Sequence, residues 1–183
     1  MWHRIRKGSL ALASLWLALP AAAQSSTKAK IASALSAAPA AIARNAAVKD
    51  WPDKNGSMAA LHGGSNGWVC FPSHPANKYR KNDAMCIDDQ WQEWMSAYKQ
   101  KRKPNISKVG YAYMLSADDW ASNTDMSAKA PTPENQWHKL GPHVMVLYPD
   151  AKMLEGLPTT PGAMGPYIMA PGSDFAHVMW PMR

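Results

Sequence analysis

The first 23 residues constrain the fold most, because they decide which part of the chain folds and in which compartment. Basic residues at the start are followed by an apolar stretch from Leu10 to Leu19, then by Pro20 and three alanines at 21–23. This order is typical of a secretory signal peptide, and the apolar stretch is too short to cross a bilayer. We expect a Sec-type leader over 1–23, cleavage before Gln24, and a periplasmic or secreted protein with no membrane span.

Removal of this leader sets the size and charge of the folded part. Residues 24–183 make 160 residues, a length typical of one domain. The leader carries three of the 20 basic residues and none of the 13 acidic ones, so the net charge falls from +7 to +4. A surplus of this size aids solubility and, in an exported protein, gives little reason to expect a nucleic-acid partner. We predict a single soluble globular domain over 24–183.

The chain has two cysteines, Cys70 and Cys86. In an oxidising compartment such a pair favours a disulfide, and its spacing fits neither a C-x-x-C redox motif nor a zinc ribbon. In the chain-entropy model, closing the loop between the two cysteines would stabilise the folded protein by roughly 3 kcal/mol. We predict a structural disulfide.

Two regions carry helical patterns. Residues 28–49 are rich in alanine with one apolar stripe, and Pro39 divides them into two short helices. A further helix is predicted with Asp89 as its N-cap and with Gln92, three residues later, completing a capping box. Its apolar face consists of residues three or four positions apart: Trp91, Trp94, Met95 and Tyr98. The helix ends in a basic run, Lys99, Lys101, Arg102 and Lys103, which matches the negative end of its dipole.

Short strands are predicted mostly later in the chain. They cover 58–61, 68–71, 109–115, 144–148, 167–169 and 176–180. Segments 72–85 and 116–134 are predicted loops, and 150–156 a short helix. Early helices and late strands favour an α+β fold, in which the alanine-rich helices and the central amphipathic helix pack on a mainly antiparallel sheet.

Two His-x-Met units are candidate metal ligands. They are His143 with Met145 and His177 with Met179. Residues i and i+2 of a strand share a face, so two adjacent strands would bring four ligands together. Imidazole and thioether ligands favour copper, Cu(I) in particular. The alternative is that methionine fills an irregular core and the histidines are hydrogen-bonded structural residues.

Residues 63–67 contain a literal G-x-S-x-G centred on Ser65, with Asp150 and His177 later in the chain. That order suits a small serine hydrolase. The segment after the motif is strand-like rather than helical, and glycine, serine and asparagine are also typical of a simple turn.

Tryptophans in or beside loops are a further candidate site, because indoles in a groove commonly bind small ligands. They are Trp68, Trp120, Trp137 and Trp180.

Several motifs together resemble a group of uncharacterised exported bacterial proteins. They are Asn66-Gly-Trp-Val-Cys70, Asp83-Ala-Met-Cys86, Trp91-x-x-Trp94, Tyr113-Met-Leu115, Ser122-Asn-Thr-Asp125 and Gly141-Pro-His-Val-Met145. The resemblance covers the chain from about residue 30 to its end. It implies export, a bacterial source and a bridged cysteine pair, and it implies no activity.

These observations favour a non-enzymatic domain that binds a small ligand or an envelope protein through its Trp-, Met- and His-rich C-terminal half. A periplasmic copper-binding protein and a serine hydrolase are the two alternatives.

Overall fold

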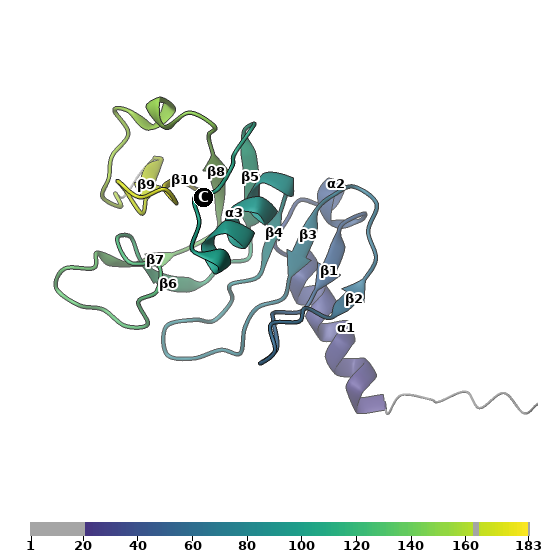
Figure 1. Cartoon of the computed structure of the whole chain (residues 1–183). Coiled ribbons are helices and arrows are strands. Elements are labelled where there is room, and N and C mark those ends of the chain that lie inside the picture. The colour runs from purple at the N-terminus through teal and green to yellow at the C-terminus, as the bar shows by residue number, and fades with distance from the viewer. Residues whose placement is uncertain (1–20, 163–164, 183) are drawn as a thin grey trace, which may run out of the picture.

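The computed structural model describes residues 21–162 and 165–182, which form three α-helices, a 3-10 helix and ten strands (Figure 1). The helices are α1 (Ala21–Leu35), α2 (Ala40–Ala43), α3 (Asp89–Gln100) and the 3-10 helix η1 (Ala151–Leu154). The first five strands are β1 (Ala47–Lys49), β2 (Ala60–His62), β3 (Val69–Phe71), β4 (Met85–Ile87) and β5 (Gly110–Met114). The others are β6 (Asp119–Ser122), β7 (Trp137–Leu140), β8 (His143–Leu147), β9 (Tyr167–Met169) and β10 (His177–Pro181).

Eight of the described strands form one sheet in the order β2-β1-β3-β4-β5-β8-β10-β9. Neighbouring strands are antiparallel except β1 and β3, which are parallel. Strands β6 and β7 pair separately as a hairpin. The α+β prediction with a mainly antiparallel sheet is therefore confirmed.

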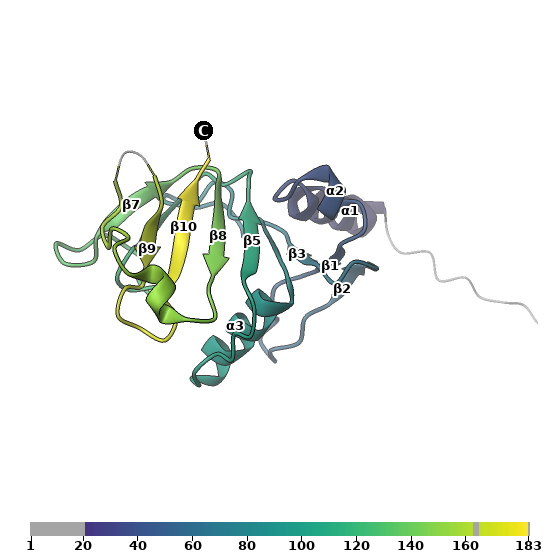
Figure 2. The same ribbon diagram turned by 90° about the horizontal axis from the view of Figure 1, so that it is seen from above.

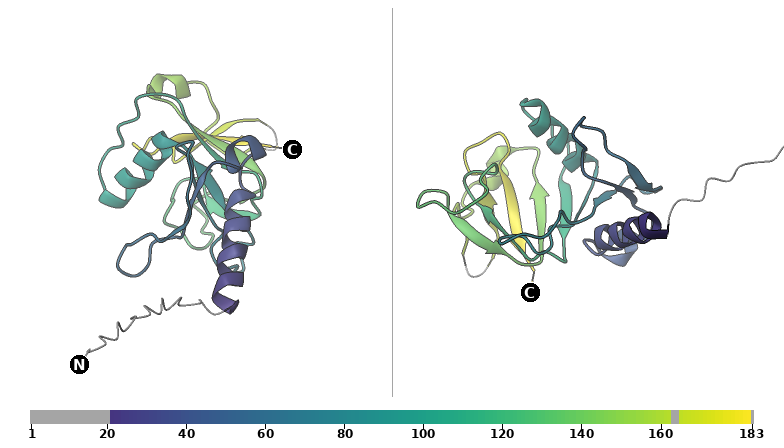
Figure 3. Two further views of the ribbon diagram at one scale, coloured as in Figure 1. Left: turned by 90° about the vertical axis from the view of Figure 1, so that its right-hand side faces the viewer. Right: turned by 90° about the horizontal axis from the view of Figure 1, so that it is seen from below.

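The sheet has a different covering on each face, and α1 and α3 lie on opposite sides of it (Figures 2 and 3). On one face, small residues of α1 such as Ala34 pack around Val48, Cys70 and Cys86, all four fully buried. On the other, α3 contributes Trp91 to a larger core. That larger core contains Phe71, Ile87, Met114, Met145, Met169 and Met179.

Cys70 and Cys86 stand directly opposite each other in β3 and β4 and are joined by a disulfide. The loop was predicted over 72–85, but its last residue, Met85, is the first residue of β4, so the predicted end of the loop was wrong. The predicted disulfide is therefore present. It joins β3 to β4 on the face of the sheet that α1 covers.

The N-cap of helix α3 lies one residue before the expected one. Asp88, not Asp89, is the N-cap, because its carboxylate accepts from Trp91 N at 3.0 Å and also from Tyr111 N of β5 at 2.6 Å. The same carboxylate thus starts the helix and fixes it to the sheet. At the other end Lys101 ends the helix in a left-handed conformation (φ 54°), and the basic run that follows is exposed.

Gly110 of β5 lets α3 approach the sheet. A Cβ at this position would lie 2.6 Å from Gln90 Cβ, in the buried first turn of α3. We expect Gly110→Ala to lower the free energy of unfolding by about 1–3 kcal/mol, because α3 must move away from β5. Urea unfolding measures this change. Gly141→Ala is the matched control, since its Cβ would meet no atom within 4 Å; equal stability of the two variants would contradict the argument.

The predicted leader lies almost wholly outside the described residues, and its last three residues form the first turn of α1. Export therefore stays a prediction. Across the parts of the chain that the structure describes, no helix has both the length and the apolar character needed to cross a membrane.

Candidate functional site

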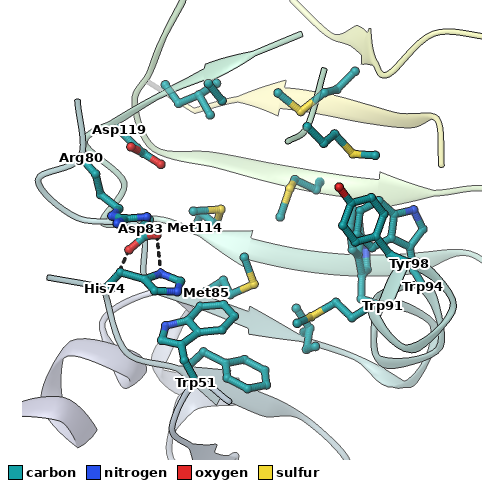
Figure 4. A pocket seen from close by; sticks show the side chains of 18 of the residues that line it. Trp51, His74, Arg80, Asp83, Met85, Trp91, Trp94, Tyr98, Met114 and Asp119 are labelled. Carbon is teal, nitrogen blue, oxygen red and sulfur yellow. Dashed lines mark hydrogen bonds and ion pairs between the residues drawn. The ribbon is translucent and has the colours of Figure 1, made fainter. Parts of the chain in front are cut away.

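A cavity of about 1300 Å³ lies over the face of the sheet that carries the larger core (Figure 4). Its walls come from α3, from the loop before β4 and from the β6–β7 hairpin. Among the described residues, eight of the chain's 12 methionines and five of its nine tryptophans line it. The surplus of these two residue types is therefore concentrated at one place in the fold.

The floor of the cavity is a ladder of methionines and histidines across four strands. Met145 of β8 stands directly opposite Met179 of β10. Towards β5, Met114 is opposite His143, and towards β9, Met169 is opposite His177. Each histidine therefore has one methionine across the strand and another two residues along its own strand. Thioether side chains are flexible and polarisable, so such a floor adapts to the shape of what it contacts.

The predicted His-x-Met units do lie on neighbouring strands and on the same face, but their histidines are at opposite ends. His143 pairs with Pro181, which is four residues from His177 along β10, a separation of roughly 13 Å at ~3.3 Å per residue. Side chains stand roughly perpendicular to a sheet, so one ion does not bridge both rings. The expected single four-ligand arrangement is not what the structure shows.

Both histidines are 2% exposed and have the same hydrogen bonding. Nδ1 of His143 lies 2.7 Å from Gly141 O, and Nδ1 of His177 lies 3.0 Å from Phe175 O. A carbonyl only accepts, so each Nδ1 carries the proton and each Nε2 has a free lone pair. Neither Nε2 has a hydrogen-bond partner among the described residues. Burial lowers the pKa of His143, and it lowers that of His177 to about 4, so both rings are neutral at pH 7.

Indoles of α3 surround His177. The ring centroids of Trp91 and Trp94 lie 5.0 and 5.7 Å from the imidazole, both nearly perpendicular to it. Trp94 Nε1 donates to Phe175 O at 3.3 Å, the carbonyl that also accepts from His177. Trp91 Nε1 is buried and has no acceptor among the described residues. One donor, Trp91 Nε1, and one acceptor, His177 Nε2, are thus both without partners at this end of the cavity.

The opposite end of the cavity is polar and is built on Asp83 (Figure 4). This carboxylate lies 2.8 Å from His74 Nδ1, accepts from Ser73 Oγ at 3.0 Å and lies 3.5 Å from Arg80. Burial favours a raised pKa for Asp83, but the hydrogen bonds from His74 and Ser73 outweigh it and the pKa is lowered. The carboxylate therefore stays ionised and orients the imidazole.

Two neighbours complete this polar end. Trp51 stacks on His74, with ring centroids 4.2 Å apart, and on Phe71 at 4.8 Å. Burial raises the pKa of Asp119, and the nearby charge of Asp83 adds to that effect. No sequence motif indicated His74 and Asp83, which lie nine residues apart in a loop. A local pattern does not show that a loop folds back on itself.

The four predicted tryptophans divide between the two faces. Trp120 and Trp137 line the cavity, and the Nε1 of Trp137 is buried without a partner in the described part of the chain. Trp68 instead packs against Tyr113 on the face that α1 covers, with ring centroids 5.5 Å apart. Trp180 is 47% exposed and points to the face opposite Met179. Sequence reasoning missed Trp51, Trp91 and Trp94 as cavity residues, although the helical spacing of the last two placed them on one face.

The residues of the predicted hydrolase triad lie apart. Ser65 is exposed in the turn between β2 and β3, near one edge of the sheet, and its backbone N donates to Asn45 O. His177 lies in β10, four strands from β3 in the sheet order. Asp150 caps η1 by accepting from Lys152 N. The structure does not bring these three side chains together.

No three residues of the types His, Cys, Asp and Glu gather into a metal-binding group within residues 21–162 and 165–182. Any metal at the ladder would therefore need thioether ligands. Comparison of the chain with protein-family models, with curated proteins and with solved structures gave no match.

Proposed function

We propose that this chain binds a small, mainly apolar molecule with hydrogen-bonding groups at its ends, and that it does no chemistry on it. The observation that carries the proposal is a cavity of about 1300 Å³ with a floor rich in methionine. The buried polar atoms without partners among its described lining residues are few and belong to Arg80, Trp91, Trp137, His143 and His177. Ligand sites combine mostly apolar lining with a few polar groups in this way.

The apolar part of the ligand is expected to lie over Met85, Met114 and Met145. These three residues come from three neighbouring strands, β4, β5 and β8, and all line the cavity. Trp51 and Phe71 extend the apolar wall on one side. An extended or fused-ring molecule fits such a floor better than a sugar, because a sugar would leave its hydroxyl groups against thioethers without partners.

The polar groups of the ligand are expected to meet atoms that lack partners in the protein. Trp91 Nε1 and Trp137 Nε1 are donors, Arg80 Nε is a third, and all three are buried. A buried donor without an acceptor costs about 1–3 kcal/mol. A ligand with hydroxyl or carbonyl oxygens would accept hydrogen bonds from these donors and remove that cost. The unpartnered donors therefore favour a mainly apolar ligand that carries a few such oxygens.

The proposal is tested with N-phenyl-1-naphthylamine, a neutral aromatic probe whose fluorescence rises in an apolar site. We expect the oxidised protein to enhance the probe's emission saturably. Met145→Trp, which fills the floor of the cavity, is expected to weaken probe binding by roughly 10-fold or more, equivalent to about 1.4 kcal/mol. Thermal unfolding checks that the variant is folded.

Tyr111→Trp is the matched control. Tyr111 lies in β5, is 43% exposed and points away from the cavity, so the same new side chain should leave probe binding unchanged. No saturable enhancement, or equal binding by the two variants, would overturn the proposal.

A further inference from the structure

The β9–β10 end of the cavity has the features of a metal site rather than of a satisfied core. His177 is 2% exposed and lines the cavity, yet its Nε2 has no hydrogen-bond partner among the described residues. The hydrogen bond from Nδ1 to Phe175 O fixes the tautomer that leaves the Nε2 lone pair free. Ligating histidines commonly have this arrangement, in which the second nitrogen donates to a carbonyl.

Two methionines are neighbours of His177 in the sheet. Met179 is two residues along β10 on the same face, and Met169 is directly opposite His177 in β9. They are 1% and 7% exposed, and both line the cavity. Strand pairing therefore places one nitrogen and two sulfur donors on adjacent positions of a buried surface.

We propose that His177, Met169 and Met179 bind one Cu(I) ion at this end of the cavity. Thioethers and imidazole are ligands that Cu(I) prefers, whereas divalent ions of harder character favour carboxylate and water. The acidic residues that line the cavity, Asp83 and Asp119, belong to its opposite end. The three ligands are uncharged, so a monovalent ion costs less to bury among them than a divalent one.

The indoles of α3 distinguish His177 from His143, although the ladder offers both histidines a similar set of donors. Trp91 and Trp94 lie within 6 Å of the His177 ring, and no ring contact of this kind is found for His143 among the described residues. Indole rings exclude water and attract a nearby cation through their π-electrons. Both effects favour Cu(I) at His177.

Copper binding goes beyond the proposed binding of an apolar molecule and does not depend on it. The three ligands occupy one end of the floor, while Met85 and Met114 lie towards the polar end, beside His74 and Asp83 (Figure 4). The disulfide lies in the core on the opposite face, so no thiol takes part.

The test is a titration of the oxidised protein with Cu(I), kept reduced by ascorbate without oxygen and buffered by the chelator bicinchoninate. We expect saturable quenching of tryptophan fluorescence by one equivalent, because Trp91 and Trp94 adjoin the site. His177→Gln should weaken this quenching phase by ~100-fold or more, at least the loss that removing an outer partner of a metal ligand causes. Zn²⁺ in excess should not compete.

Two further variants keep the result interpretable. Met169→Leu with Met179→Leu conserves volume and apolar character, so it keeps the fold and is expected to lose the same quenching phase. His143→Gln is the matched control, since His143 has equal burial and the same Nδ1 bond but no indole beside it. Quenching that survives in His177→Gln or in the methionine variant, or that is lost equally in His143→Gln, would overturn the proposal. Unchanged binding of N-phenyl-1-naphthylamine by His177→Gln would show that the apolar-ligand site and the Cu(I) site are independent of each other.

Discussion

Replacing Cys70 and Cys86 together by alanine should lower the free energy of unfolding by about 3 kcal/mol, the value expected for cross-linking a loop of about 15 residues. The bridge joins directly opposed residues of β3 and β4, and both cysteines are fully buried under α1. Urea unfolding with and without the bridge measures the loss.

The reduced wild-type protein is the control for this variant, because it keeps both sulfur atoms and removes only the covalent bond. It should lose most of the same stability. If reduction costs less than about 1 kcal/mol while the double alanine variant costs about 3 kcal/mol, packing of sulfur under α1 is the cause and the cross-link is not.

Acidification should destabilise the protein between pH 6.5 and pH 4, because His177 is neutral and buried when folded. Its pKa falls from 6.5 to about 4 on folding, so in this window the unfolded chain binds a proton that the folded chain does not. Stability therefore rises with pH across the window and is lost as the pH falls. The shift corresponds to about 3 kcal/mol, and the lowered pKa of His143 acts in the same direction.

Urea midpoints across this pH range measure the effect. His177→Gln should flatten the dependence, since glutamine does not titrate, whereas His62→Gln at an exposed position of β2 should leave it as in the wild type. A wild-type protein equally stable at both ends of the range would contradict a neutral, buried His177. The lowered pKa of Asp83 acts only below its ordinary value of 3.8, so its loss of stability follows at more acidic pH.

The fold class followed from sequence because the strongest local signals agree with the tertiary structure. The spacing of Trp91 and Trp94 predicted α3, and the apolar run at 144–148 predicted β8 within one residue. Strands β1, β4, β6 and β7 were missed. Ala47–Lys49 continues an alanine-rich segment and is extended because it pairs with β3 and β2, which is a long-range effect.

The site was predicted in part for the same reason. The i, i+2 rule placed His143 with Met145 and His177 with Met179 on one face, and the structure agrees. That rule does not give the register between strands, which separates the two histidines and adds Met114 and Met169 from β5 and β9. The polar end was not predicted at all, since His74 meets Asp83 only after the loop folds.

The register of β8 and β10 assigns separate tasks to odd-numbered and even-numbered positions. Met145 and Met179 face the cavity, whereas Val146 and Val178 are buried on the opposite face and pair with each other. Substitutions at Met145 or Met179 are therefore expected to alter which ligands the cavity binds. Substitutions at Val146 or Val178 are expected to alter the packing on the opposite face of the sheet. The residues that contact a ligand and those buried on the opposite face thus form two separate sets along the same strands, so the first set can be changed while the second is kept.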